Sequence, residues 1–72
     1  MNNSSGNIRV GKNIKNLREK AGLTQAQVAK KSGISTNYFA VIERGEVTTS
    51  HINLKKISQA LGVDISKITD TK

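Results

Sequence analysis

The sequence predicts an all-α domain built from five short helices. Three observations support this fold class. Apolar residues recur at spacings of three and four, which is the pattern of amphipathic helices. No proline is present, and no stretch alternates between apolar and polar residues as a strand would. Glycines follow the apolar runs where helices commonly end, and these are Gly22, Gly33, Gly45 and Gly62.

The first residues of the chain differ from the rest because they are mainly Asn, Ser and Gly without apolar periodicity. We therefore expect a flexible N-terminal segment at residues 1–8 and a single domain at residues 9–69. The first helix is expected to begin near Val10 and to end at Gly22. Its apolar face holds Val10, Ile14, Leu17 and Ala21.

Two short helices are expected in the middle of the chain, with three residues between them. Thr24 can cap the first of these, and Gln27 lies three residues further on, as in a capping box. Gly33 is expected to end this helix. Ser35 can then cap the next helix.

A fourth helix and one final turn complete the predicted domain. Ser50 or Thr49 can cap the fourth helix, and Gly62 ends it. Asp64 can cap the final turn. The apolar faces of these two elements comprise Ile52, Leu54, Ile57, Ala60, Leu61, Ile65 and Ile68.

The chain is strongly basic, with twelve Lys and Arg against five Asp and Glu, a net charge of +7 and a pI near 10.2. A pI above about 9 is typical of nucleic-acid-binding domains, although solubility, a membrane surface or an acidic partner would also explain it. The absence of cysteine fits a reducing cytosol. No apolar run approaches the ~20 residues of a membrane span, and the polar N-terminus does not resemble a signal peptide. We therefore expect a cytoplasmic protein with no membrane partner.

Enzymatic activity is not expected from this composition. One His, no Cys and a few scattered acids leave no acid–base or nucleophile pair. The glycines never form a GxGxxG loop. The same residues cannot supply a structural metal site, and no cofactor is expected. Recognition of single-stranded RNA favours exposed aromatic side chains. Only Tyr38 could have this role, so RNA binding is not expected either.

The second and third helices follow the helix-turn-helix plan, because their three-residue turn contains Gly33. The major groove of DNA is about 12 Å wide and admits one helix, which the other helix braces against the backbone. Gly33 suits a turn that needs positive φ, and Ala29 suits a close helix crossing. Phe39 and Ile42 share a face and are expected to point inward. The outer face of the third helix then holds Thr36, Asn37, Ala40 and Val41.

These features resemble the phage repressor and Cro-like helix-turn-helix family, also called the Xre family. The resemblance covers about residues 9–68, where "LREKAGLTQAQVAKKSGIS", "YFAVIERG" and "ALGVDISKI" follow the family pattern. It implies a five-helix lambda-repressor-like DNA-binding domain whose third helix enters the major groove of double-stranded DNA.

The resemblance also implies roles for individual residues. The base edges would be read by Thr36, Asn37, Ala40 and Val41. The phosphates would be contacted by Gln25, Ser35, Tyr38, Arg44, Thr48 and Thr49. Arg18 and Glu43 stand where many family members pair an arginine with a glutamate. The alternative is two exposed charges that contribute little to stability.

Two positions depart from the family pattern. The loop before the fourth helix usually carries basic or Asn-Pro residues, but here it holds Glu46, which repels phosphate. We therefore expect this loop to act through hydroxyls and backbone amides. His51 stands where the family often has leucine, and we expect a partly buried imidazole there rather than a metal ligand.

The expected function is that of a sequence-specific transcriptional regulator that binds DNA as a homodimer on a pseudo-palindromic operator. Repression is favoured because activators of this family often present acids on the second helix, which here carries Lys30 and Lys31. Ile65 and Ile68 are expected either to form the dimer interface or to cap the core of the monomer. The alternative function is that of an antitoxin or anti-regulator acting through a protein partner.

Overall fold

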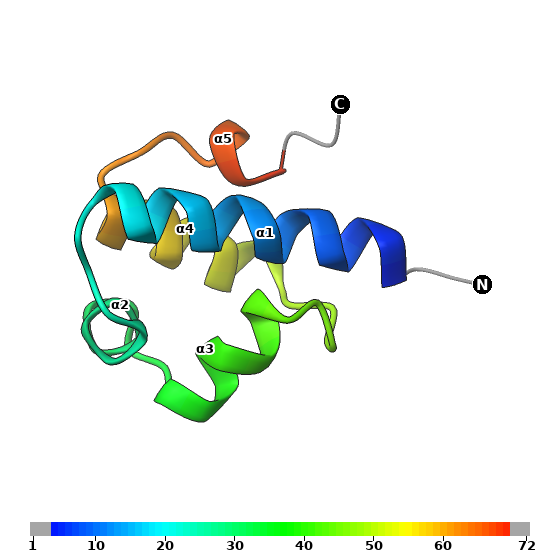
Figure 1. Cartoon of the computed structure of the whole chain (residues 1–72), viewed down its shortest axis with the longest axis horizontal. Helices are drawn as coiled ribbons and strands as arrows, with labels where there is room; N and C mark the ends of the chain where they lie inside the picture. The colour runs from blue at the N-terminus through cyan, green and yellow to red at the C-terminus, as the bar shows by residue number, and fades with distance from the viewer. Residues whose placement is uncertain (1–3, 70–72) are drawn as a thin grey trace.

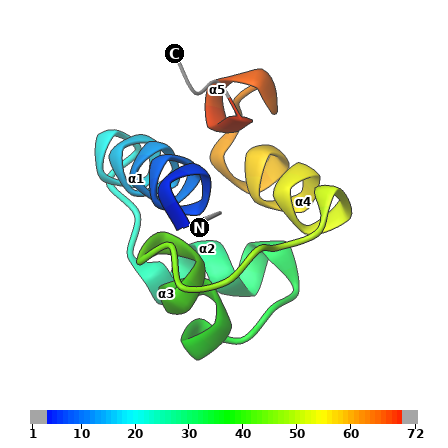
Figure 2. The same cartoon turned by 90° about the vertical axis from the view of Figure 1, so that its right-hand side faces the viewer.

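Five helices follow one another, with no strand, in residues 4–69, which the computed structural model describes. They are α1 (Ser4–Lys20), α2 (Gln25–Ser32), α3 (Thr36–Glu43), α4 (His51–Leu61) and α5 (Ser66–Thr69). In Figure 1, α1 runs across the molecule with α3 below it and α5 above it. Figure 2 shows α4 alongside α1, with α2 beneath both. The predicted all-α class and the five-helix plan are confirmed.

The core forms where all five helices meet. Its buried apolar side chains are Ile14, Val28, Ala29, Phe39, Ile42, Leu54, Ile57, Leu61 and Ile68. α2 and α3 have only eight residues each, and isolated helices shorter than about 12 residues are marginal in water. Burial against α1 and α4 therefore stabilises these two helices. No helix within residues 4–69 has the length and apolar character needed to cross a bilayer.

The predicted helix caps are confirmed. The hydroxyl of Ser35 accepts a hydrogen bond from the amide of Tyr38 at 3.0 Å. Ser50, rather than Thr49, caps α4 by accepting a bond from the amide of Asn53 at 3.1 Å. At the end of the chain, the carboxylate of Asp64 accepts a bond from the amide of Ser66 at 3.0 Å. Hydrogen bonds from Ser66 lower the pKa of Asp64 below its ordinary value.

The expected start of the first helix near Val10 is wrong, because α1 begins at Ser4. The side-chain amide of Asn7 donates to the hydroxyl of Thr48 at 3.0 Å. Ile8 lies so close to Gly45 that a Cβ there would meet the Ile8 backbone at 2.6 Å. These partners are far along the chain, so local periodicity gives no sign of them. Residues 4–8 of the predicted flexible segment therefore belong to α1, and residues 1–3 of that segment lie outside the described residues.

Gly11 allows α1 to approach the end of α3. A Cβ at this position would lie 2.6 Å from the carbonyl oxygen of Ile42 and closer still to that of Glu43. Both obstacles are backbone atoms, which cannot rotate away as a side chain could. The sequence interpretation assigned Gly11 no role in packing.

Two expectations about α4 are wrong. Ile52 is 67% exposed instead of lying on the apolar face, because helix geometry places it about 200° around the axis from buried Leu54. His51 is exposed rather than partly buried, since it occupies the first position of α4. In α5, Ile68 is completely buried in the core of the single chain, whereas Ile65 is half-buried. The monomer-core alternative therefore accounts for Ile68, which has no surface to offer a second copy.

Candidate nucleic-acid interface

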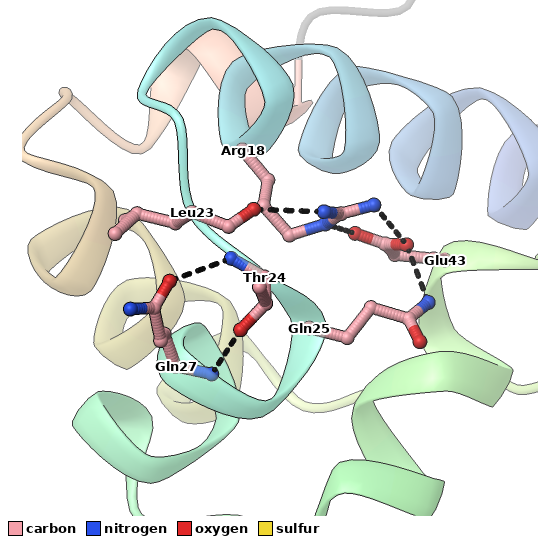
Figure 3. A network of polar contacts seen from close by, with 6 residues as sticks. All are labelled: Arg18, Leu23, Thr24, Gln25, Gln27 and Glu43. Atoms are coloured by element: carbon pink, nitrogen blue, oxygen red, sulfur yellow. Dashed lines mark hydrogen bonds and ion pairs between the residues drawn. The ribbon is translucent and has the colours of Figure 1, made fainter.

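A reciprocal pair of hydrogen bonds fixes the start of α2. The backbone amide of Thr24 donates to Oε1 of Gln27 at 2.8 Å, and the amide of Gln27 donates to the hydroxyl of Thr24 at 3.1 Å (Figure 3). At the other end, Gly33 adopts the left-handed conformation with φ of 74°. Because Cβ crowding disfavours this conformation in other residues, glycine is suited to the turn that leads into α3. Both predicted signals are confirmed.

The side chains of α3 divide into an inner and an outer group. Phe39 is completely buried and Ile42 is 2% exposed, so both point into the core as predicted. Thr36 and Asn37 are exposed in the first turn. Of the other predicted base-reading residues, Ala40 and Val41 are each half-buried. The outer face of α3 therefore offers its most accessible polar groups near its N-terminus.

Arg18 and Glu43 form the predicted ion pair, which joins α1 to α3 (Figure 3). Nε of Arg18 donates to Oε2 of Glu43 at 2.6 Å, and Nη2 donates to Oε1 at 3.3 Å. Nη1 of Arg18 donates to the carbonyl oxygen of Leu23 at 2.9 Å. The two charged side chains are only 12% and 3% exposed, so the alternative of two exposed charges is wrong.

Gln25 joins this network, a contact that was not predicted. Its Nε2 donates to Oε1 of Glu43 at 2.8 Å (Figure 3). A carboxylate can only accept, so the amide nitrogen must face Glu43 and one of its two hydrogens is committed there. The predicted phosphate contact would thus have to use the second hydrogen of this half-buried side chain. We call Arg18, Glu43 and Gln25 the buried network.

Internal hydrogen bonds also hold the loop between α3 and α4. The hydroxyl groups of Tyr38 and Thr49 lie 3.0 Å apart, and Nδ2 of the Asn53 side chain donates to the hydroxyl of Thr49 at 3.3 Å. Thr48 is bonded to Asn7 of α1. These hydrogen bonds hold Tyr38, Thr48 and Thr49, the residues predicted to contact phosphate, in fixed positions. Because a hydroxyl can both donate and accept, an internal bond does not prevent a further bond to phosphate. Asn7 and Asn53 were missed, because nothing in their local sequence marks them as partners of the loop.

Arg44 is paired with Glu46 across the end of α3. Nε of Arg44 donates to Oε2 of Glu46 at 2.8 Å, and Nη2 donates to Oε1 at 3.2 Å. This hydrogen bonding lowers the pKa of Glu46 and raises that of Arg44. The carboxylate of Glu46 thus compensates the charge of the Arg44 guanidinium. The predicted attraction of Arg44 for phosphate and the predicted repulsion of phosphate by Glu46 therefore depend on each other.

Comparison with known proteins gives a consistent result. The helix-turn-helix (HTH_3) family model matches residues 14–68. The restriction-modification controller protein C.AhdI of Aeromonas hydrophila superposes with a TM-score of 0.87 and is 28% identical. That match covers 89% of this chain and 97% of C.AhdI.

Two curated relatives are each 41% identical to this chain. One is the uncharacterized HTH-type transcriptional regulator y4dJ of Sinorhizobium fredii, and the match covers 86% of this chain and 82% of the relative. The other is the immunity repressor protein of Bacillus phage phi105. There the match covers 82% of this chain but 41% of the repressor, so the chain corresponds to less than half of that protein.

Proposed function

The chain belongs to the helix-turn-helix family of repressor and Cro-like proteins, and we propose that it is a sequence-specific DNA-binding regulator of transcription. α3 would enter the major groove, with α2 bracing it against the DNA backbone. The observation that carries this proposal is the accessible first turn of α3 on a scaffold fixed by the caps and the buried network.

The reading of bases is assigned first to Asn37 and Thr36. Asn can form two hydrogen bonds with an adenine edge, and Thr can contact any base through its hydroxyl or methyl group. Ala40 and Val41 would add apolar contacts with thymine methyl groups. The hydroxyls of the α3–α4 loop and the second amide hydrogen of Gln25 would hold the phosphates.

Repression is proposed as the direction of regulation. Activators of this family often present acids on the second helix, whereas Lys30 and Lys31 are exposed on α2 and the sequence of α2 holds no acid. We also propose a homodimer on two half-sites about 34 Å apart, or a multiple of this spacing, because the paired recognition helices must meet the same face of the duplex. Because Ile68 is buried in the core of the single chain, only half-buried Ile65 remains as the proposed contact in the dimer interface.

Binding-site selection followed by fluorescence anisotropy at several salt concentrations tests DNA binding. We expect Asn37→Ala to lose about 1–3 kcal/mol of discrimination at one base pair. Asn16→Ala is the matched control, because Asn16 is exposed on α1. A wild-type chain without sequence preference at any salt concentration would contradict the proposal.

Sedimentation of the wild type and Ile65→Asp tests the dimer, with circular dichroism confirming that the variant is folded. We expect a dimeric wild type and a monomeric variant. A wild type that is monomeric both alone and on selected DNA would remove the homodimer from the proposal.

A further inference from the structure

A shallow hollow of about 540 Å³ lies where the end of α2 packs beside α4. Figure 2 shows α2 passing beneath α4 before the chain turns toward α3. The hollow is lined by Lys30, Lys31, Ser32, Gly33, Lys56, Gln59 and Ala60. We call it the lysine hollow. Its lining includes none of the predicted base-reading residues.

The charges around the lysine hollow are unbalanced. Lys30, Lys31 and Lys56 come from two helices, and none forms an ion pair with a carboxylate in residues 4–69. The helix dipole is sufficient to explain the two lysines at the C-terminal end of α2. Lys56 lies in the middle of α4, where this explanation does not apply, and no acid lines the hollow.

Ser32 provides an independent observation. The residue is 3% exposed, and its hydroxyl has no hydrogen-bond partner within the described residues. A buried hydroxyl without a partner reduces stability. Serine within a helix often bonds to the carbonyl four residues earlier, but Ser32 makes no such bond. Ser32 thus lines a hollow that carries positive charge, and its buried hydroxyl is a donor without an acceptor.

We propose that the lysine hollow binds a phosphate group. The lysine ammonium groups neutralise a dianion, and the amide of Gln59 supplies a neutral donor. The buried hydroxyl of Ser32 supplies a second donor once its side chain rotates toward the hollow. Gly33 also lines the hollow, and the space beside its Cα is open, since a Cβ built there would meet no atom within 4 Å. The phosphate could belong to a soluble compound or to the backbone of bound DNA, and the experiment separates these two sources.

The first experiment uses the free chain and no DNA, so it does not depend on the proposed function. Amide shifts are recorded by NMR during titration with inorganic phosphate and pyrophosphate, with acetate and chloride at matched ionic strength as comparisons. We expect saturable shifts at Ser32, Gly33 and Gln59 with phosphate and pyrophosphate only. We expect Lys56→Gln to weaken this binding about twofold to fivefold, whereas Lys15→Gln, an exposed charge on α1, leaves it unchanged.

Thermal melting of Ser32→Ala gives a second measurement on a variant that is expected to fold. We expect its melting temperature in chloride to be higher than that of the wild type, because the unpartnered hydroxyl is gone. We expect phosphate to raise the melting temperature of the variant less than that of the wild type. An equal response of the two proteins to phosphate would contradict the role of Ser32.

DNA titrations then identify the source of the phosphate. If it comes from the duplex, Lys56→Gln lowers the slope of log affinity against log salt by about 0.9 relative to Lys15→Gln. If it comes from a soluble compound, the two variants share one slope, and pyrophosphate still binds the complex with DNA. Absence of localised shifts in the free chain, together with equal slopes, overturns the proposal.

Discussion

The two Arg–Glu pairs of this chain have nearly the same geometry in different surroundings. Arg18 and Glu43 bond at 2.6 and 3.3 Å, and Arg44 and Glu46 bond at 2.8 and 3.2 Å. The first pair is 12% and 3% exposed, whereas the second is 55% and 54% exposed. Hydrogen-bond lengths alone would suggest that the pairs are equivalent, but their surroundings give them different roles.

Burial determines what happens when one partner is lost. Water can solvate Glu46 if Arg44 is removed, so an exposed pair of this kind contributes little to stability. Glu43 is enclosed by α1, α2 and α3, so removal of Arg18 would leave a desolvated charge. We therefore expect the buried network to hold the helices together and the exposed pair to adjust the charge near the DNA.

The largest effect is expected for Arg18→Ala. Loss of one partner of a buried pair costs about 3–5 kcal/mol, a large share of the roughly 5–15 kcal/mol that stabilises a native domain. The matched control Arg44→Ala is expected to cost much less, because water solvates the exposed Glu46 that remains. Urea unfolding measures both, and equal losses for the two variants would show that burial does not distinguish the pairs.

A double replacement sharpens this comparison. Arg18→Met combined with Glu43→Leu removes both charges, so no desolvated ion remains, and we expect less loss of stability than for Arg18→Ala. Gln25 and the carbonyl of Leu23 lose their partners in the double variant, so some loss is still expected. A double variant less stable than Arg18→Ala in urea would show that the attraction outweighs the cost of desolvation.

The accuracy of the sequence predictions depends on whether an interaction is local or distant along the chain. Thr24, Ser35 and Gly33 were identified correctly because caps and turns depend on neighbours within a few residues. Arg18–Glu43 was predicted from the family resemblance, but its third member, Gln25, was assigned to phosphate alone. Ile68 could be placed in the core only after α5 was seen against α1. The partner of Asn7 could likewise not be predicted, since it lies 41 residues away.

A smaller effect is expected for Glu46→Gln, and it concerns DNA affinity. This change removes a negative charge and frees Arg44 to contact phosphate. One additional phosphate contact steepens the salt dependence by ~0.9 and corresponds to about fivefold tighter binding near 0.15 M salt. Glu19→Gln is the control with the same charge change, because Glu19 is exposed on α1. Equal gains in anisotropy titrations for both variants would indicate a general charge effect.

The smallest effect is expected in the acid titration of Glu46. Hydrogen bonding to Arg44 lowers its pKa in the folded chain, so the stabilisation by this pair is present above the ordinary pKa of Glu. It is lost as the pH falls through the lowered pKa, because protonation removes the attraction. NMR titration of the Glu46 carboxyl should therefore give a midpoint below the ordinary value in the wild type and a return to that value in Arg44→Gln. The same midpoint in the wild type and in Arg44→Gln would mean that the exposed pair does not persist in solution. Contact of Arg44 with DNA would then not depend on Glu46.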